Sequence, residues 1–321
     1  MPAPSLRALP SLRQLRYLLA LSEVRNFTRA AEACYVTQST LSAGLKELEG
    51  TLGSQLVERD RQSVRMTPLG EEIARRAREL LAGAADLVEV AAAARSMAGT
   101  VRLGVIPTIA PFLLPQVLPG LRERHPGLRL ALREDLTGNL LARLHAGELD
   151  FALIALPFHT GELLVEPIFD DELWLVAPAG DPVLGLERLV ISQKVAGRLL
   201  LLEEGHCLRD QTLLACGRRQ VASAGELEAT SLLTLLQMVE SGLGLALVPE
   251  IAIQAGLLAA GKLVARPLAA PAPRRTIALV ARKSTARVEE FSAIAAAIGA
   301  MRAARHAAVM TSKGRRKNGP G

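Results

Sequence analysis

The stretch AAEACYVTQSTLSAGLKELEGTLGSQLVER, residues 30–59, indicates two short helices that meet at a tight turn. Its first part is rich in alanine, and such small side chains let two helices approach closely. Thr37 is a good N-cap for the second helix, because its hydroxyl can accept a hydrogen bond from a free amide of the first turn. Leu41, Leu45 and Leu48 then form one apolar stripe at helical spacing. The pattern predicts a helix-turn-helix unit.

The neighbouring residues set the expected limits of these helices. A helix is predicted at 11–25, before the break at Asn26. Thr28 is expected to cap the short helix Arg29–Cys34, and the second helix is expected to run from Gln38 to Glu49 and to stop at Gly50.

The second helix carries small polar side chains over its N-terminal half, which suits the major groove of DNA. Gln, Ser and Thr can reach base edges or phosphates, and the helix N-terminus favours a phosphate. Residues 53–67, GSQLVERDRQSVRMT, then read as two short strands around a basic turn, as in a wing that contacts the DNA backbone. A plain helical hairpin with a solvated face is the alternative, and the basic wing favours DNA binding. The residues predicted to contact DNA are Thr28, Arg29, Thr37, Gln38, Ser39, Thr40, Ser42, Lys46, Arg59, Arg61 and Arg65.

Composition limits the class of protein. The chain has 321 residues, of which 50% are hydrophobic, 22% charged and only 3% aromatic, which is ordinary for a soluble globular protein. No uncharged apolar run approaches the roughly 18 residues of a membrane helix, and the N-terminus lacks a secretion signal. Three cysteines do not make a disulfide scaffold. We therefore expect a reduced, cytoplasmic protein that has no membrane partner.

The net charge of +6 is not by itself a sign of nucleic-acid binding. The last 21 residues contain six basic residues and no acid, so they account for the whole excess. By composition, the sequence predicts a basic disordered tail at 306–321.

The rest of the chain suggests a long helix followed by an α/β sensor. Thr67-Pro68 is a cap with proline at the first helical position, and one helical pattern runs from there to about Ala98. Strand and helix patterns then alternate, which predicts parallel sheets with right-handed crossovers. Two such lobes would hold a ligand cleft between them. The predicted parts are a winged helix-turn-helix domain at 1–66, a linker and dimerisation helix at 67–99, sensor lobe I at 100–170 and 275–305, sensor lobe II at 171–274, and the tail.

The motif at 30–59 resembles the DNA-binding head of LysR-type transcriptional regulators, and the resemblance extends from about residue 10 to 305. It implies a winged helix-turn-helix, a linker helix and a two-lobed sensor like a periplasmic binding protein. Residues 199–216, which contain GHCLRDQTLLAC, resemble the peroxide-sensing branch of that family, and so do residues 229–250.

Two of the three cysteines, Cys207 and Cys216, stand at the ends of one predicted helix, between Gly205-His206 and Gly217. Cys207 at the helix N-terminus, with His206 and Arg209 nearby, is predicted to have a lowered pKa and to be the nucleophile. Nine residues rise about 13.5 Å along a helix, whereas a disulfide needs Cα atoms within about 7 Å. The resemblance implies that hydrogen peroxide oxidises Cys207 to a sulfenic acid and that a Cys207–Cys216 disulfide then remodels the sensor.

The resemblance also assigns a peroxide pocket around Cys207. Thr108 and Thr137 match threonines that line this pocket in the peroxide-sensing branch, although Thr137 could equally cap a helix. Arg209 would stabilise the thiolate, and His206 and Asp210 are further candidates. Cys34 is interpreted as a small core residue. The predicted pocket residues are Thr108, Thr137, His206, Arg209 and Asp210.

Other classes stay open. A regulator that binds a small metabolite in the interlobe cleft would remain inducible without either cysteine. A cysteine peroxidase would be an enzyme and would have no use for residues 28–65. A metal site at His206, Cys207 and Cys216 lacks a fourth soft ligand. We therefore expect no metal, no cofactor and no enzymatic activity.

The partners implied by the resemblance are promoter DNA, a second copy in a homodimer or homotetramer, and RNA polymerase. Hydrogen peroxide would be the signal, and a thiol reductant would reset the switch.

Overall fold

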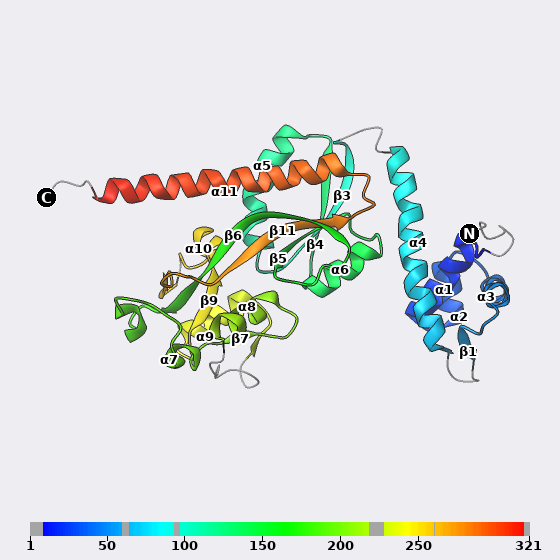
Figure 1. The fold of residues 1–321 in the computed structure, drawn as a ribbon, viewed down its shortest axis with the longest axis horizontal. Coiled ribbons are helices and arrows are strands. Elements are labelled where there is room, and N and C mark those ends of the chain that lie inside the picture. Colours follow the sequence, from blue (N-terminus) through cyan, green and yellow to red (C-terminus); the bar gives the residue numbers. More distant parts are fainter. Residues whose placement is uncertain (1–8, 60–63, 93–96, 218–227, 260, 318–321) are drawn as a thin grey trace. The chain divides into compact units, whose positions relative to one another are not determined.

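The computed structural model describes residues 9–59, 64–92, 97–217, 228–259 and 261–317 (Figure 1). The chain divides into two compact units, made mainly of residues 1–94 and of residues 95–321. Among the described residues, no helix is both long and apolar enough to cross a membrane.

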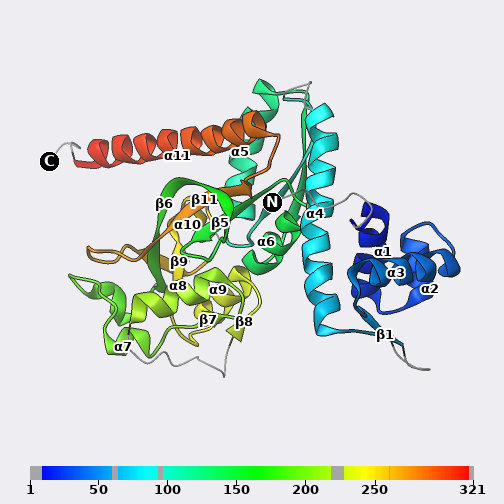
Figure 2. The same cartoon turned by 45° about the vertical axis from the view of Figure 1, so that its right-hand side comes forward.

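The N-terminal unit is a winged helix-turn-helix, whose helices α1 to α3 pack together in Figure 2. Leucines from α1 and α3 and alanines from α2 and α4 build its core. The capping box of Ser11 and Gln14 fixes the start of α1. The elements are α1 (Leu12–Val24), α2 (Phe27–Ala33), α3 (Gln38–Leu52), β1 (Val57–Arg59), β2 (Val64–Met66) and α4 (Pro68–Ala92).

The predicted caps of the two central helices fare differently. The Thr37 hydroxyl accepts a hydrogen bond from the backbone N of Thr40 at 3.2 Å, so the predicted N-cap of α3 is confirmed. The predicted cap of α2 at Thr28 is wrong. Asn26 holds that place, since its side chain accepts from the backbone N of Arg29 at 3.0 Å. The amide oxygen of Asn is at least as good a cap as the Thr hydroxyl.

Two helix ends also differ from the expected ones. Gly50 does not stop α3, which continues to Leu52 and ends at Gly53, where φ is +63°. Only the second glycine adopts the left-handed conformation that ends a helix. Thr67 caps α4 as predicted, because its hydroxyl accepts from the backbone N of Gly70 at 2.9 Å. The helix ends at Ala92 rather than near Ala98.

A seven-stranded sheet runs through the second unit in the order β10-β6-β11-β5-β3-β4, with β9 also paired to β6. The predicted parallel arrangement holds for β3 with β4 and β5. It is wrong for β6, β9, β10 and β11, which pair antiparallel. After β10 the chain returns along β11, so β11 runs opposite to its neighbours β5 and β6. The strands are β3 (Gly99–Val105), β4 (Leu128–Glu134), β5 (Phe151–Leu156), β6 (Leu163–Pro178), β7 (Leu201–Leu202), β8 (Glu228–Ala229), β9 (Ala246–Pro249), β10 (Leu263–Arg266) and β11 (Arg274–Arg282).

The second unit has two lobes, each with its own hydrophobic core. We call them lobe I and lobe II, after the lobes expected from the sequence. The core of lobe I gathers around β3, β5 and β11, and the core of lobe II around β9 and the second half of β6. The single long strand β6 thus passes from one core to the other. The helices are α5 (Ala110–Arg124), α6 (Thr137–His145), α7 (Gln193–Ala196), α8 (Cys207–Cys216), α9 (Leu232–Glu240), α10 (Glu250–Gln254) and α11 (Val288–Lys317), with a 3-10 turn at Pro182–Gly185.

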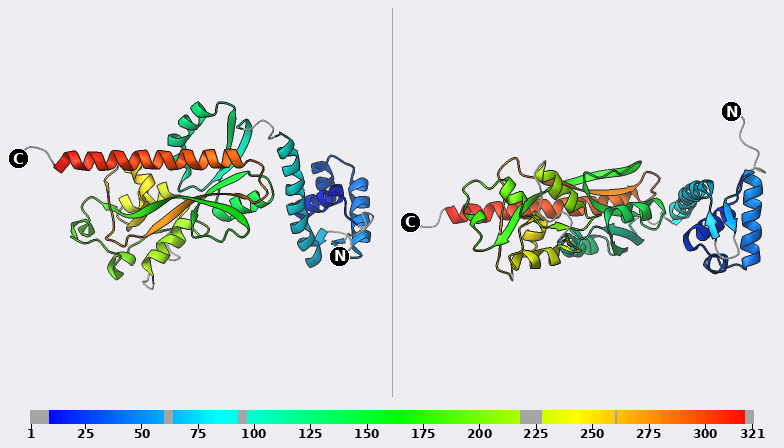
Figure 3. Two further views of the ribbon diagram at one scale, coloured as in Figure 1. Left: turned by 45° about the horizontal axis from the view of Figure 1, so that its top comes forward. Right: turned by 90° about the horizontal axis from the view of Figure 1, so that it is seen from below.

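The last helix is longer than the sequence suggests. In lobe I, α11 packs against α5 and β6 and continues to Lys317 (Figure 3). The expected disordered tail, 306–321, is therefore helical in backbone as far as Lys317. Alanine is frequent through this helix, and alanine has the highest helix propensity of all residues.

Candidate functional site

Helix α3 presents its polar N-terminal half on the surface of the helix-turn-helix. The side chains predicted there to contact DNA are exposed, except that Ser42 is half-buried. The hydroxyl of Thr28, on α2, donates to the side-chain oxygen of Gln38 at 3.2 Å, so the two helices present a continuous polar face. This surface can offer hydrogen-bonding groups to base edges.

The wing is fixed to the same helix by a half-buried carboxylate. The Glu49 carboxylate accepts hydrogen bonds from the backbone N of Leu56 and of Val57, at 2.8 and 3.1 Å. The short strands β1 and β2 then pair antiparallel and expose Arg65. The Arg59 side chain and the whole of Arg61 lie outside the described residues. The geometry places at least one basic wing residue beside the polar helix.

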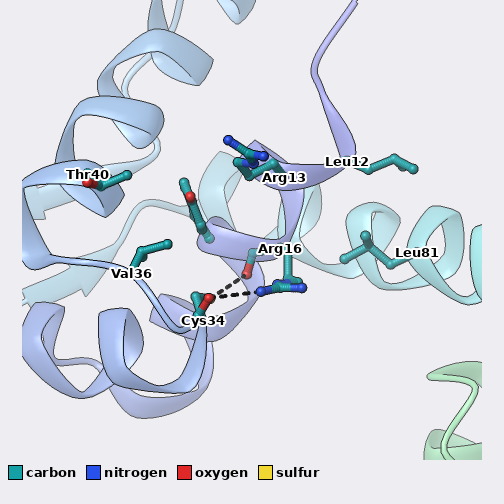
Figure 4. Close-up of a pocket in the computed structure, with 8 residues that line it drawn as sticks. Leu12, Arg13, Arg16, Cys34, Val36, Thr40 and Leu81 are labelled. Atoms are coloured by element: carbon teal, nitrogen blue, oxygen red, sulfur yellow. Dashed lines mark hydrogen bonds between the residues drawn. The ribbon is translucent and has the colours of Figure 1, made fainter.

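Cys34 is a structural residue of this unit. It is buried, and its carbonyl oxygen accepts a hydrogen bond from Arg16 Nη2 at 2.9 Å (Figure 4). Its thiol donates weakly to the Arg16 carbonyl oxygen, with Sγ 3.9 Å away. These contacts tie the turn after α2 to α1, as expected of a small core residue. An open hollow beside it is lined by Leu12, Arg13, Arg16, Tyr17, Cys34, Val36, Thr40 and Leu81.

The other two cysteines stand at the first and last positions of α8, as the sequence predicts. Both are buried, and neither is part of a disulfide. Cys207 packs in the core of lobe I, whereas Cys216 packs in that of lobe II. A helix of this length separates its ends by about 13.5 Å. The two thiols therefore belong to different cores and cannot bond while α8 is intact.

A small cavity lies beside Cys207. It is too tight to admit a water-sized sphere. Gly205 approaches it in the left-handed region, with φ +90°, and a Cβ there would come within 2.9 Å of Leu136. The position therefore requires glycine. The lining residues are Ile106, Pro107, Thr108, Leu136, Thr137, Gly205, His206 and Cys207.

Two threonine hydroxyls face the thiol, as the sequence predicts. The hydroxyl of Thr108 accepts a hydrogen bond from Arg275 Nη1 at 2.8 Å, which leaves its own hydrogen free to be donated to Cys207. Thr137 is the first residue of α6, and no backbone hydrogen bond to its hydroxyl is recorded among the described residues. Its hydroxyl lies close enough to Cys207 to lower the pKa of that thiol, which is consistent with the pocket role.

Arg275 is a pocket residue that sequence reasoning missed. It lies on β11, it is almost fully buried, and its Nη2 also donates to the carbonyl oxygen of Thr108 at 3.1 Å. Asp171, directly opposite on β6, binds its Nε through Oδ2 at 3.0 Å. The arginine within the predicted strand RRTIALVARK, residues 274–283, could have indicated this role, because a charge inside a buried strand needs a specific partner.

The predicted lowering of the Cys207 pKa is wrong. Burial raises the pKa of the Cys207 thiol, because the low-dielectric interior penalises the thiolate. The charge of Arg275 and the hydroxyls of Thr108 and Thr137 oppose this effect, while Asp210 adds to it. The resting sulfur is therefore a protonated thiol surrounded by donors for its anion.

The remaining predicted pocket residues are only partly at the thiol. His206 lines the cavity, and burial lowers its pKa, so its ring is neutral at pH 7. Asp210 lies one turn along α8 from the thiol. Arg209 does not serve the thiolate as expected. Its Nη1 binds Glu228 at 2.5 Å and the Leu202 carbonyl oxygen at 2.9 Å, since a residue two positions after Cys207 projects from another face of the helix.

Both units match known families. Residues 12–71 match the bacterial regulatory helix-turn-helix protein, lysR family, and residues 94–302 match the LysR substrate binding domain. This chain belongs to the LysR family. It is 47% identical over 292 residues to the HTH-type transcriptional regulator EstR of Acinetobacter baylyi, over 89% of this chain and 95% of that one. It is 37% identical to the DNA-binding transcriptional dual regulator OxyR of Escherichia coli, over 90% and 95% of the two chains.

Solved structures resemble this LysR-family chain over nearly its whole length. A cysteine variant of full-length OxyR from Pseudomonas aeruginosa has a TM-score of 0.71 and 38% identity, and the match covers 90% of this chain and 94% of that one. A peroxide-bound cysteine variant of OxyR from Corynebacterium glutamicum has a TM-score of 0.63 and 34% identity, with 95% and 96% covered. The LysR-family fold expected from the sequence is thus confirmed.

Proposed function

We propose that this LysR-family regulator senses hydrogen peroxide through Cys207 and Cys216 and controls the transcription of antioxidant genes. The observation that carries this proposal is the position of two cysteines, not joined by a disulfide, at opposite ends of α8, one of them beside a small cavity lined by hydroxyls. The relatives named OxyR and the peroxide-bound OxyR structure support it.

The first step is attack by Cys207 on one oxygen of hydrogen peroxide. The S–O bond forms as the O–O bond breaks, and the thiol proton joins the departing hydroxide to give water. Arg275 and the hydroxyls of Thr108 and Thr137 favour the developing thiolate. The product is a sulfenic acid on Cys207.

In the second step the Cys216 thiol displaces that oxygen. An S–S bond forms, the S–O bond breaks, and the oxygen leaves as a second water. Two thiols thereby lose two electrons in total, and one peroxide is reduced to two waters. A thiol reductant reverses the disulfide.

The second step requires α8 to unfold. The helix holds its ends about 13.5 Å apart, and a disulfide tolerates no more than about 7 Å between Cα atoms. Cys207 and Cys216 must therefore leave one or both cores. This rearrangement is the structural signal of the sensor unit.

Cavity size favours peroxide over a metabolite. The space beside Cys207 has no room for a water-sized sphere, whereas ordinary small-molecule sites have roughly 300–1,000 Å³. A carboxylate or aromatic metabolite therefore does not fit beside Cys207, whereas hydrogen peroxide, with two oxygen atoms, requires the smallest movement of the lining residues. Because the thiols are consumed once per signal, the protein acts as a stoichiometric switch in the cytoplasm rather than as an enzyme.

The output is carried by DNA binding and oligomerisation. In a homodimer or homotetramer, the exposed faces of α3 and the wing read half-sites about one helical turn apart. The rearrangement of the sensor changes the spacing of these heads, and the oxidised form recruits RNA polymerase.

Peptide mapping by mass spectrometry tests the proposal. The reduced full-length protein receives about one equivalent of hydrogen peroxide, beside Cys207→Ser and the control Cys34→Ser. A rapid, reductant-reversible disulfide between Cys207 and Cys216 is expected in the wild type and in the control, and none in Cys207→Ser. Slow oxidation that is indifferent to Cys207→Ser would contradict the proposal.

A further inference from the structure

Asp171 and Arg275 form an ion pair inside lobe I. They are directly opposite each other on β6 and β11, and both side chains are fully buried. A guanidinium remains charged in a protein interior, so its charge requires a partner there. Asp171 is the carboxylate that provides this balance.

Asp171 is itself held from a second side. Its Oδ1 accepts a hydrogen bond from the backbone N of Ile251, in the first turn of α10, at 3.0 Å. Its Oδ2 receives Arg275 Nε at 3.0 Å. The carboxylate therefore has one orientation, and so has the planar guanidinium that it binds.

The remaining donors of Arg275 meet Thr108. Nη1 donates to the Thr108 hydroxyl at 2.8 Å, and Nη2 to its carbonyl oxygen at 3.1 Å. Since the hydroxyl oxygen accepts from Arg275, its hydrogen is directed elsewhere, and Cys207 is the neighbour that can take it. Two residues, Arg275 on β11 and Thr108 after β3, thus connect Asp171 to the sulfur of Cys207.

We propose that Asp171 is a positioning residue for the oxidation of Cys207, acting through Arg275 and Thr108. It fixes the guanidinium against Thr108 and offsets part of the positive charge that the sulfur experiences. The inference rests on the proposed role of Cys207 as the peroxide-reactive thiol.

The other charged and titratable groups around the thiol are few among the described residues. Arg275 on β11 favours the thiolate, while Asp210 on α8 disfavours it. His206, also beside the cavity, is neutral at pH 7, because burial lowers its pKa. Burial raises the pKa of Asp171, and the charge of Arg302 on α11 opposes this effect together with Arg275. Asp171 is therefore the group that determines how strongly Arg275 attracts the thiolate.

Removal of the Asp171 charge has a specific expected effect. Asp171→Asn leaves the charge of Arg275 unbalanced, so the Cys207 thiolate becomes more favourable. The titration of the thiol is expected to move toward acid by about one pH unit, and oxidation at neutral pH to become about tenfold faster. Simple structural damage would instead slow the reaction.

The experiment uses the full-length protein with Cys34→Ser and Cys216→Ser, so that only Cys207 contributes. The ultraviolet absorbance of the thiolate is followed against pH, and the rate with hydrogen peroxide is measured beside it. Asp150→Asn is the matched control, because Asp150 is a buried carboxylate that pairs with Arg102 at 2.7 Å elsewhere in lobe I. The control is expected to titrate like the parent, and Asp171→Glu is expected to restore most of the parental profile.

An unchanged titration in Asp171→Asn, or a shift toward alkaline pH, overturns the inference. Asp171→Ser replaces Asp171→Asn if the latter does not fold, with the same expected direction. The thiolate titration does not depend on peroxide. A parent that titrates normally but ignores peroxide therefore refutes the proposed function, while the titration still decides the role of Asp171.

Discussion

Cys207 and Cys216 begin and end the same helix, α8, yet their side chains pack in the cores of different lobes. A bond between them therefore removes a buried residue from at least one core. Reduced and oxidised sensors cannot share one packing, which is the physical basis of a two-state switch.

Replacement of the second cysteine is expected to separate the two oxidation steps. Cys216→Ser should still form a sulfenic acid on Cys207, because the cavity beside Cys207 is unchanged. No thiol is then available to displace the oxygen, so the acid should persist and α8 should remain folded. Mass spectrometry with a sulfenic-acid probe, together with circular dichroism, measures both. A rapid loss of helix in this variant would contradict the order of the steps.

The stability of α8 is expected to set the ease of disulfide formation. Leu214 is a suitable probe, because its side chain is 70% exposed and it lies within the helix. Leu214→Gly should weaken α8 by about 1 kcal/mol relative to Leu214→Ala. The disulfide should then be about fivefold more favourable in the glycine variant, as measured by equilibration with a glutathione buffer. Equal disulfide stability in the two variants would show that α8 need not unfold.

The hydroxyl of Thr108 is expected to contribute to both stability and reactivity. Thr108→Val leaves Arg275 Nη1 without its hydroxyl acceptor, which should lower the free energy of unfolding by about 1–3 kcal/mol. It should also slow sulfenic acid formation, because a donor to the sulfur is lost. Thr108→Ser keeps the hydroxyl and is the matched control. Denaturation curves give the free energy of unfolding, and stopped-flow kinetics give the rate of sulfenic acid formation. Equal rates in the Val and Ser variants would show that the Thr108 hydroxyl does not assist the oxidation.

The raised pKa of Cys207 predicts a distinct pH dependence. The folded thiol has a pKa above the ordinary value of 9.0, so the protonated form is the favoured one. The associated stability is complete below pH 9 and is lost as the pH rises through the folded pKa. Below that pH the thiolate fraction changes about tenfold per unit. The rate of oxidation by peroxide should thus rise steadily from about pH 6 to about pH 8, and a plateau near neutrality would indicate a lowered pKa instead.

Two residues of the head are expected to affect DNA binding differently. Gln38→Ala should cost about 1–3 kcal/mol at the specific operator and relax the preference at one base pair. Arg65→Gln should weaken binding about equally on all sequences and reduce the salt dependence by about one ion. Titrations on operator and unrelated DNA at several salt concentrations separate the two. Identical behaviour of both variants would show that α3 does not read bases.

Short-range sequence patterns specify the local elements of this protein. The cap at Thr37, the stripe of Leu41, Leu45 and Leu48, and the limits of α8 between His206 and Gly217 each depend on residues within a few positions. Such features follow from backbone hydrogen bonding and side-chain spacing, so they can be recognised in a linear pattern. The conflict between an intact α8 and a Cys207–Cys216 disulfide can also be recognised in the sequence, because it depends only on the spacing of the two cysteines along one helix.

The tertiary structure alone decided the environment of the reactive sulfur. Arg275 reaches Thr108 across 167 positions of sequence, and it meets Asp171 because β11 runs antiparallel beside β6. The predicted direction of the Cys207 pKa shift is wrong for the same reason. Helix position and neighbouring letters indicate attraction for an anion, but burial opposes it, and burial depends on residues that only the fold brings together.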